Sequence, residues 1–546
     1  MQLDHSLLDS PYDMERVPTE LKACLNAHGL YNSIQFVLRL SPEVHRKIEA
    51  MPTGIVEGGV DFDGVQAFST YLHETVHWWQ HIGSTTGLML SLSYPGQAHA
   101  NYKQLKSLIG SIGPKKSILR VVETTVEPGG FGTPRGEENF VVNTHFDIEF
   151  FRILITNPLM APQAIEHPLF DCIGHSYQIA YGNIALVLAS TLDNDFKVFP
   201  DPRGWSEPFA ALRAKKRQGF YYRSDVRLVP MGAHEIFEGQ ARFSQLQYLY
   251  FASGSKLQWD DVRSMGMLKG IYAKAFQEFL NLAELEWPAS IGHPVVALFM
   301  LVCDIAINPG AGFPMPLRHF QTFIEDVDPG FRFVFLCRAI AKQRPDLVDF
   351  IKHYSREEYL EVSEALCQLL IVEPPLTIAK AVASWRDGAG ELKSLTEEHR
   401  SFAYGPRNLP VRLLFAHFMA FCEDKLARPE VFCWPGAWMT GERVSPEIVA
   451  LFERQSAPFV DKANDGGIYP RLMAGKDEAT VQSSFDSFYA MNVTYDLTRQ
   501  WIAMPGPFEY EYGWLSSTAE PKNMRDFAAH HFEKIYGVHP DKFKLV

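Results

Sequence analysis

Residues 72–83 read LHETVHWWQHIG, and this stretch places three histidines, one glutamate and two adjacent tryptophans in an otherwise apolar run. The apolar positions around it recur in steps of three and four, which is the period of a helix. Gly83 then supplies a signal for the end of the helix. We therefore expect one buried helix over residues 63–82. The positions that set its period are Val65, Phe68, Leu72, Val76 and Trp79.

Within this helix, His73, Glu74 and His77 form an HExxH pattern. Side chains four residues apart lie on the same face of a helix, so both imidazoles can bind one metal ion. The Glu74 carboxylate, next to His73, can reach a water on that ion and act as its general base. Polar groups left unpaired in a buried helix are costly, and a metal ion would satisfy them. The pattern therefore predicts a metal site.

His81 lies four residues beyond His77, but helix geometry argues against it as a third ligand. Between His73 and His81 the helix advances by about 12 Å and rotates by about 80°. One tetrahedral ion cannot bridge that separation. We expect His81 either to contact a metal ligand without binding the metal itself or to act as a cation near the negative end of the helix dipole.

A third ligand must come from another segment, and the best candidate lies in HEIFEGQAR at residues 234–242. Its element Glu238-Gly239-Gln240-Ala241 resembles the E-G-x-A element of gluzincin metallopeptidases. The pair Trp78-Trp79 is similar to the aromatic residue that follows the second histidine in gluzincins of the aminopeptidase type. The small Gly239 and Ala241 would let this second helix pack closely against the metal helix.

The gluzincin resemblance implies a zinc metallopeptidase in which His73, His77 and Glu238 bind one zinc ion and Glu74 activates a water molecule on it. The resemblance covers only these two short segments. His77 and Glu238 are 161 positions apart (238 − 77), much farther than in the aminopeptidases, so no subfamily is identified. Residues 84–229 or thereabouts are then expected to be a long insertion.

Other residues compete for roles at this site. Glu235 lies one turn before Glu238 and is the alternative third ligand, with Asp304 as a further option. His234 is a candidate neighbour of the ligands or stabiliser of the transition state, with a plain surface histidine as the equal alternative. Candidate donors to a developing oxyanion are Tyr181, Tyr272, Arg242 and His293.

The expected fold class is α+β and predominantly helical, with a zincin-like core, a small sheet beside the HExxH helix and large helical additions. Residues 33–40 predict a strand, and residues 117–126 and 139–148 predict a hairpin. Prolines 374–375 and the DGAG at 387–390 suggest a boundary between a metallopeptidase region, 1–380, and an aromatic-rich C-terminal extension, 381–546. Further helices are predicted at about 168–192, 230–252, 262–285, 292–307, 331–343 and 356–371.

Composition limits the class of protein. The 546-residue chain has a formal net charge of −13, which argues against a broad nucleic-acid surface. Its seven cysteines include no CxxC pair, which is typical of a reduced, cytoplasmic chain. The N-terminus lacks the pattern of a signal peptide, and we expect no membrane span.

The sequence therefore favours a cytoplasmic zinc peptidase with one zinc ion per chain and a narrow range of peptide or protein substrates. One alternative is a non-catalytic or regulatory zinc-binding interaction protein. Another is a specialised effector or defence protease that cleaves one target protein. The C-terminal region is a candidate surface for a regulatory protein partner.

Overall fold

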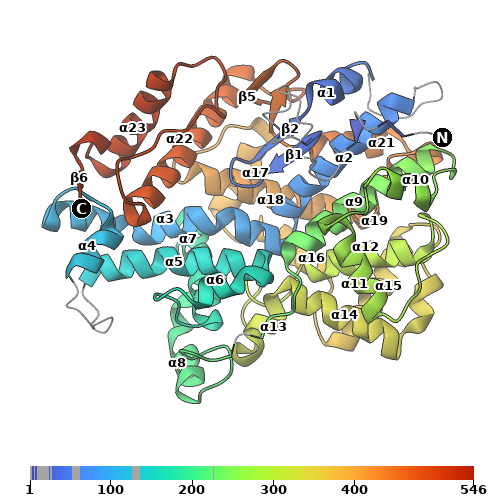
Figure 1. Ribbon diagram of the computed structural model, residues 1–546, viewed down its shortest axis with the longest axis horizontal. Coiled ribbons are helices and arrows are strands. Elements are labelled where there is room, and N and C mark those ends of the chain that lie inside the picture. Colours follow the sequence, from blue (N-terminus) through green and yellow to red (C-terminus); the bar gives the residue numbers. More distant parts are fainter. Residues whose placement is uncertain are drawn as a thin grey trace.

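The computed structural model describes residues 3–4, 7–8, 24, 27–51, 62–125, 136–225 and 227–546. This part of the chain is predominantly helical with two small sheets, as the sequence predicts (Figure 1). The strands are β1 (Gly29–Asn32), β2 (Val37–Leu40), β3 (Lys115–Lys116), β4 (Phe459–Lys462), β5 (Asp465–Pro470) and β6 (Lys544–Leu545).

The helices up to the middle of the chain are α1 (Pro42–Glu49), α2 (Phe62–Gly83), α3 (Thr85–Ile112), α4 (Ile118–Thr125), α5 (Gly136–Thr156), α6 (Ala161–Ile165), α7 (Ile173–Leu192), α8 (Ser206–Ala214), α9 (Ala233–Ala252), α10 (Trp259–Ser264) and α11 (Ile271–Leu282). Those that follow are α12 (Pro294–Ala306), α13 (Phe323–Val327), α14 (Pro329–Gln343), α15 (Arg356–Leu370), α16 (Pro375–Trp385), α17 (Gly390–Ser401), α18 (Leu409–Ala427), α19 (Pro429–Cys433), α20 (Pro435–Trp438), α21 (Pro446–Arg454), α22 (Glu478–Ala503) and α23 (Pro521–Tyr536).

The HExxH helix is α2, and the prediction for residues 63–82 is confirmed. Almost every residue of α2 is buried, because α9, α18, α3 and the larger sheet all pack around it. Its C-terminal end meets the start of α3 so closely that a Cβ at Gly87 would lie 1.9 Å from the Gln80 carbonyl oxygen. Only glycine fits at that crossing.

The larger sheet lies beside α2 and has the order β1-β2-β4-β5. Strand β1 pairs antiparallel with β2, and β2 pairs parallel with β4, where Leu38 lies opposite Val460. The strand predicted over 33–40 is wrong in its first half, because the chain turns there. Asn32 stabilises this turn by accepting hydrogen bonds from the backbone of Ile34 and Gln35.

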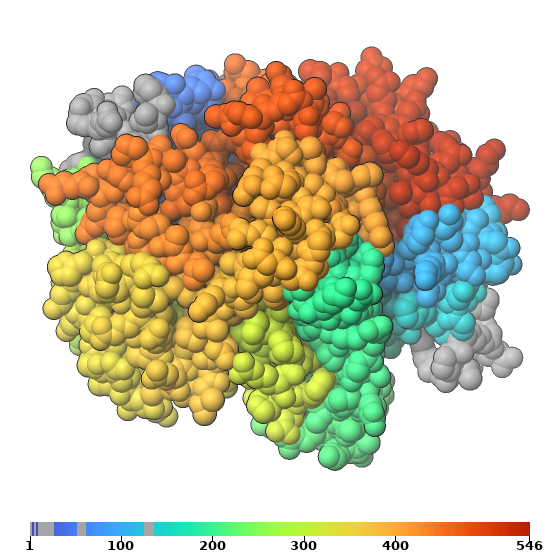
Figure 2. Space-filling model, turned by 180° about the vertical axis from the view of Figure 1, so that it is seen from behind, coloured from blue at the N-terminus to red at the C-terminus, as the bar shows by residue number. Residues whose placement is uncertain are grey.

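Contacts join the two ends of the chain. The larger sheet joins residues 29–40 to residues 459–470, and β3 pairs in parallel with β6 near the C-terminus. Helix α18, from beyond residue 380, packs directly on α2. The division at residue 380 stays a prediction. The larger sheet and the packing of α18 on α2 both join residues from the two sides of that position. On the face opposite to Figure 1, the yellow-to-red C-terminal half covers most of the surface (Figure 2).

The hairpin predicted at 117–126 and 139–148 is wrong, because both segments form helices, α4 and α5. Most of the loop predicted between them lies outside the described residues. The pairs Val121-Val122 and Val141-Val142 suggest strands by their β-branched side chains. Yet α5 buries Val141, Ile148 and Phe151 against α3 and α7, at the spacing of a helix.

The other predicted helices agree with the structure to different degrees. The helices predicted at 292–307, 331–343 and 356–371 are confirmed as α12, α14 and α15 within two residues at each end. Helix α7 begins only at Ile173, and α9 only at Ala233. The single helix expected over 262–285 is wrong, since α10 and α11 are separate.

No single described helix combines the length and apolar composition needed to cross a bilayer. Helices α15 and α16 satisfy that test only as a pair, and they are bent by 100° relative to each other.

A buried ion pair ties α12 to α18. Lys425 Nζ lies 2.5 Å from Asp304 Oδ1, and Tyr359 donates a hydrogen bond of 2.7 Å to the other carboxylate oxygen. Both charged side chains are almost fully buried. Each charge therefore depends on its partner, because burial removes the water that would otherwise stabilise it.

Replacing Lys425 by methionine should leave the Asp304 carboxylate without its counter-charge and lower the free energy of unfolding by about 3–5 kcal/mol. Urea unfolding followed by circular dichroism measures this. The double variant Asp304→Asn/Lys425→Met should be more stable than Lys425→Met alone. Arg120→Met, which breaks an exposed pair with Glu123, should change stability by about 1 kcal/mol or less. An equally small loss in Lys425→Met would contradict the prediction.

Candidate metal centre

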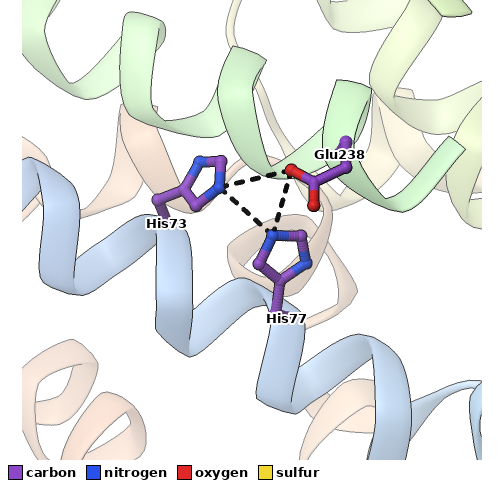
Figure 3. Close-up of side chains that lie close together, drawn as sticks. All are labelled: His73, His77 and Glu238. Atoms are coloured by element: carbon purple, nitrogen blue, oxygen red, sulfur yellow. Dashed lines mark hydrogen bonds and ion pairs between the residues drawn. The ribbon is translucent and has the colours of Figure 1, made fainter. Parts of the chain in front are cut away.

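Helices α2 and α9 bring three potential ligand atoms together (Figure 3). His73 Nε2 and His77 Nε2 are 3.1 Å apart. Glu238 Oε2 lies 3.6 Å from His73 Nε2 and 3.4 Å from His77 Nε2. Ligands at about 2.0–2.1 Å from a tetrahedral metal ion such as zinc are about 3.3 Å apart, so the spacing of the group suits a metal ion. Among the described residues, no other set of histidine, cysteine and acidic side chains converges in this way.

The polar atoms of this group are left incompletely paired by the protein. Within the described residues, no hydrogen bond reaches His73 Nδ1, and the partners of Glu238 Oε2 are the two histidine nitrogens at 3.4 and 3.6 Å, although both atoms are buried. A buried carboxylate oxygen with only such long contacts is poorly compensated for its lost water. A cation between the three ligand atoms would satisfy Glu238 Oε2 and both Nε2 atoms together. The donor set therefore fits a metal ion.

Burial and mutual charge shift the pKa values of the three groups. Burial lowers the pKa of His73 to about 4. Burial acts in the same direction on His77, but the charge and hydrogen bond of Glu238 outweigh it and raise the pKa of His77 to about 9. The pKa of Glu238 stays well below its usual range despite burial, because the positive charge of His77 faces it. In the absence of metal, these shifts favour a cationic, doubly protonated His77 ring beside a neutral His73 ring at neutral pH.

Glu74 lies between the metal ligands and strand β1 of the larger sheet. A Cβ on Gly29 of β1 would lie 2.7 Å from both Cγ and Oε1 of Glu74, so the absence of a side chain lets β1 touch the carboxylate. The charge of Glu74 also contributes to the raised pKa of His77. Glu74 is therefore close enough to the ligand group to interact with it electrostatically. This contact was missed from the sequence, because no local pattern links position 29 to position 74.

The two alternative third ligands are engaged elsewhere. Glu235 accepts a hydrogen bond from the Gly232 backbone and forms an ion pair of 2.8 Å with Lys274. Asp304 is paired with Lys425. Of the three carboxylates that the sequence offers, the structure brings only Glu238 to the histidines.

The neighbouring histidines differ in environment. The His234 side chain is 55% exposed, with Nε2 3.8 Å from Glu238 Oε1, so it borders the open side of the ligand group. His81 lies between the rings of Tyr31 and Phe237, each 5.3 Å away between centroids. Burial lowers the pKa of His81 to about 3, which favours a neutral ring over the alternative of a C-terminal cation.

Of the candidate oxyanion donors, Tyr272 and Arg242 lie near the site. The Tyr272 ring is 6.1 Å from that of His73 between centroids, and the Arg242 guanidinium stacks on Tyr272 at 4.0 Å. Tyr181 is instead buried against Phe151 and Phe323. His293 caps the start of α12.

Gly239 does not face α2, in contrast to the prediction. A Cβ there would lie 3.0 Å from the Cβ of Ala275 and 3.2 Å from the ring of Phe299. The small residue therefore lets α11 and α12 approach α9 closely.

No protein-family model matches this chain, and neither a curated protein nor a solved structure matches it. The resemblance to gluzincins therefore rests on the two motifs alone. The structure adds that His73, His77 and Glu238 form a buried group suited to a metal ion within a predominantly helical protein.

Wild-type protein supplied with zinc should hold one zinc ion per chain, and His77→Ala and Glu238→Ala should each lose it, because two ligands bind zinc far more weakly than three. Plasma mass spectrometry of desalted, folded protein measures the content. Glu235→Ala is the matched control, since it removes a carboxylate one turn away on the same helix, and it should retain the metal. Zinc kept by Glu238→Ala would exclude Glu238 as a ligand.

Metal binding should release about one proton per ion at pH 7.5, because His77 must give up its proton to become a ligand while His73 and Glu238 carry none. The part of this release that comes from His77 should fall toward zero as the pH rises through about 9, the pKa of His77. Apparent metal affinity should thus increase with pH up to that value and then level off. Calorimetric titrations in buffers of different ionisation enthalpy count the protons; no release at pH 7.5 would contradict the assignment.

Proposed function

We propose that this protein is a zinc-dependent peptidase whose metal site consists of His73, His77 and Glu238. The observation that carries the proposal is the convergence of these three ligand atoms next to Glu74. Two histidines and a carboxylate are a donor set that suits zinc. Structural zinc sites usually have four protein ligands, whereas catalytic sites have three and an open position. Three converging ligands among the described residues therefore favour catalysis.

A zinc ion held there would supply Lewis acidity, lowering the pKa of a water molecule and polarising a substrate carbonyl. Glu74 then takes the proton from the attacking water and passes it to the leaving amine, as a general base that becomes a general acid. The contribution of its charge to the raised pKa of His77 supports a carboxylate close to the ligands. The contact with Gly29 limits where that carboxylate can turn.

A peptide substrate is supported by the resemblance of the two motifs, His73–His77 and Glu238–Ala241, to those of gluzincin metallopeptidases.

Limited access supports a narrow substrate range. The side chain of His73 is 2% exposed and that of Glu238 is 19% exposed, so the ligands open to solvent mainly on the Glu238 side. The same burial favours the second candidate, a non-catalytic zinc-binding protein. Glu74 distinguishes the two, because a structural site needs no general base.

Glu74→Gln should lower peptide hydrolysis by about 10²- to 10⁴-fold while leaving zinc content unchanged, because the amide cannot accept the proton. Cleavage of a peptide library by wild type and variant, followed by mass spectrometry, measures this. Glu235→Gln, which changes a carboxylate on α9 outside the ligand group, serves as the control and should remain active. A zinc-loaded wild type without activity on any peptide would favour the non-catalytic alternative.

A further inference from the structure

Gln80 lies one turn beyond His77 on α2 and is 3% exposed. Its side-chain oxygen is 2.8 Å from His77 Nδ1. Its side-chain nitrogen donates two hydrogen bonds of 2.9 Å, to the backbone oxygen of Phe237 and to Gln240 Oε1. Both acceptors belong to α9, the helix that carries Glu238.

These bonds determine which way the Gln80 amide points. Two acceptors face its nitrogen, so its oxygen must face His77. An oxygen there accepts only from a protonated Nδ1, which leaves the lone pair of the neutral imidazole on Nε2. Nε2 is the atom that lies 3.1 Å from His73 Nε2 and 3.4 Å from Glu238 Oε2. The amide thus sets both the tautomer and the ring orientation that a metal ligand requires.

The same side chain also connects the two helices that supply the ligands. It binds α9 on both sides of Glu238, at positions 237 and 240, while it holds His77 on α2. A cavity of only about 20 Å³ borders Gln80 and Gln240, which is room for about one water molecule. Turning the amide over would instead place its oxygen against the backbone oxygen of Phe237, which cannot donate a hydrogen bond.

We infer that Gln80 is a positioning residue for the metal centre, which fixes the Nδ1–H tautomer of His77 and holds α2 and α9 at the separation that lets Glu238 join the histidines. The inference rests on the proposed metal site and adds a residue that the HExxH…E pattern does not contain. Removing such a partner of a metal-binding histidine weakens metal binding by about 10- to 100-fold.

The experiment measures the zinc affinity of the full-length chain by competition with a chromophoric chelator. Gln80→Leu keeps the approximate size and removes all three bonds, so its zinc affinity should fall by about 10- to 100-fold. Gln80→Glu keeps an oxygen toward His77, and Gln240 can turn its amide to donate to the new carboxylate. It should bind zinc more tightly than Gln80→Leu.

The matched control is Gln97→Leu. Gln97 is an equally buried glutamine on α3, and its side-chain nitrogen donates to the backbone oxygen of His145 at 3.2 Å and lies 3.3 Å from the Nδ1 of the same histidine. Its replacement should leave zinc affinity unchanged. Thermal unfolding of the metal-free variants shows whether Gln80→Leu loses more stability than this control. Nitrogen NMR of labelled histidine in the metal-free protein, at an alkaline pH where the His77 ring is neutral, reports its tautomer, which a purely structural role would not change.

Weaker zinc binding in Gln80→Leu, partial recovery in Gln80→Glu and a changed His77 tautomer would support the inference. Zinc affinity of Gln80→Leu within twofold of wild type would overturn it and leave the metal site standing. Lost affinity with an unchanged tautomer and a large loss of stability would overturn it in favour of a structural role. A wild-type chain that takes up no zinc would overturn the metal site, and this inference with it.

Discussion

The structure depends on how α2 satisfies polar side chains inside an apolar core. This helix is buried on nearly every face, yet it carries His73, Glu74, His77 and Gln80 within eight positions. Burial removes water from all four, so each needs a partner on a neighbouring element. Helix α9 supplies most of these partners through Glu238, Gln240 and the backbone of Phe237. The crossing of α2 and α9 is therefore set by polar chemistry as much as by apolar packing.

The protein satisfies this requirement only in part. Gln80 has a partner for its oxygen and for both hydrogens of its nitrogen. His73 Nδ1 has no hydrogen-bond partner within the described residues, and Glu238 Oε2 has only the two histidine nitrogens, at 3.4 and 3.6 Å. Other buried polar atoms of α2, among them Gln66 Nε2, Trp78 Nε1 and His81 Nδ1, also lack a partner there. The ligand group differs from them because its three ligand atoms converge, which is typical of a site held ready for a ligand.

The sequence predicts α2 and its motif well because both depend on local spacing. His73, Glu74 and His77 lie within five positions, and the helical period of the apolar residues is visible without any tertiary information. Glu238 was recognised through a motif resemblance, and only the structure shows its oxygen beside the histidines. Gln80, three positions after His77 on the same helix face, carried a local signal that could have been used.

The contact between Gly29 and Glu74 carried no local sequence signal, since it arises from a sheet that joins residues 29–40 to residues 459–470. The helices α4 and α5 were misread as strands because β-branched pairs favour strands locally, while packing between α3 and α7 decides for a helix.

The charges around the ligands favour the proposed chemistry over simple metal storage. A divalent cation would be balanced by the carboxylates of Glu238 and Glu74, which leaves the buried guanidinium of Arg242 as a surplus positive charge. Arg242 lies one turn beyond Glu238, stacks on Tyr272 and has two nitrogens without a hydrogen-bond partner in the described part of the chain. In a site with little water, a positive surplus stabilises negative charge more strongly than it would in solution. Hydrolysis of a peptide bond develops such a charge on the carbonyl oxygen. A site built only to hold a metal ion would gain nothing from an extra cation, which repels the metal.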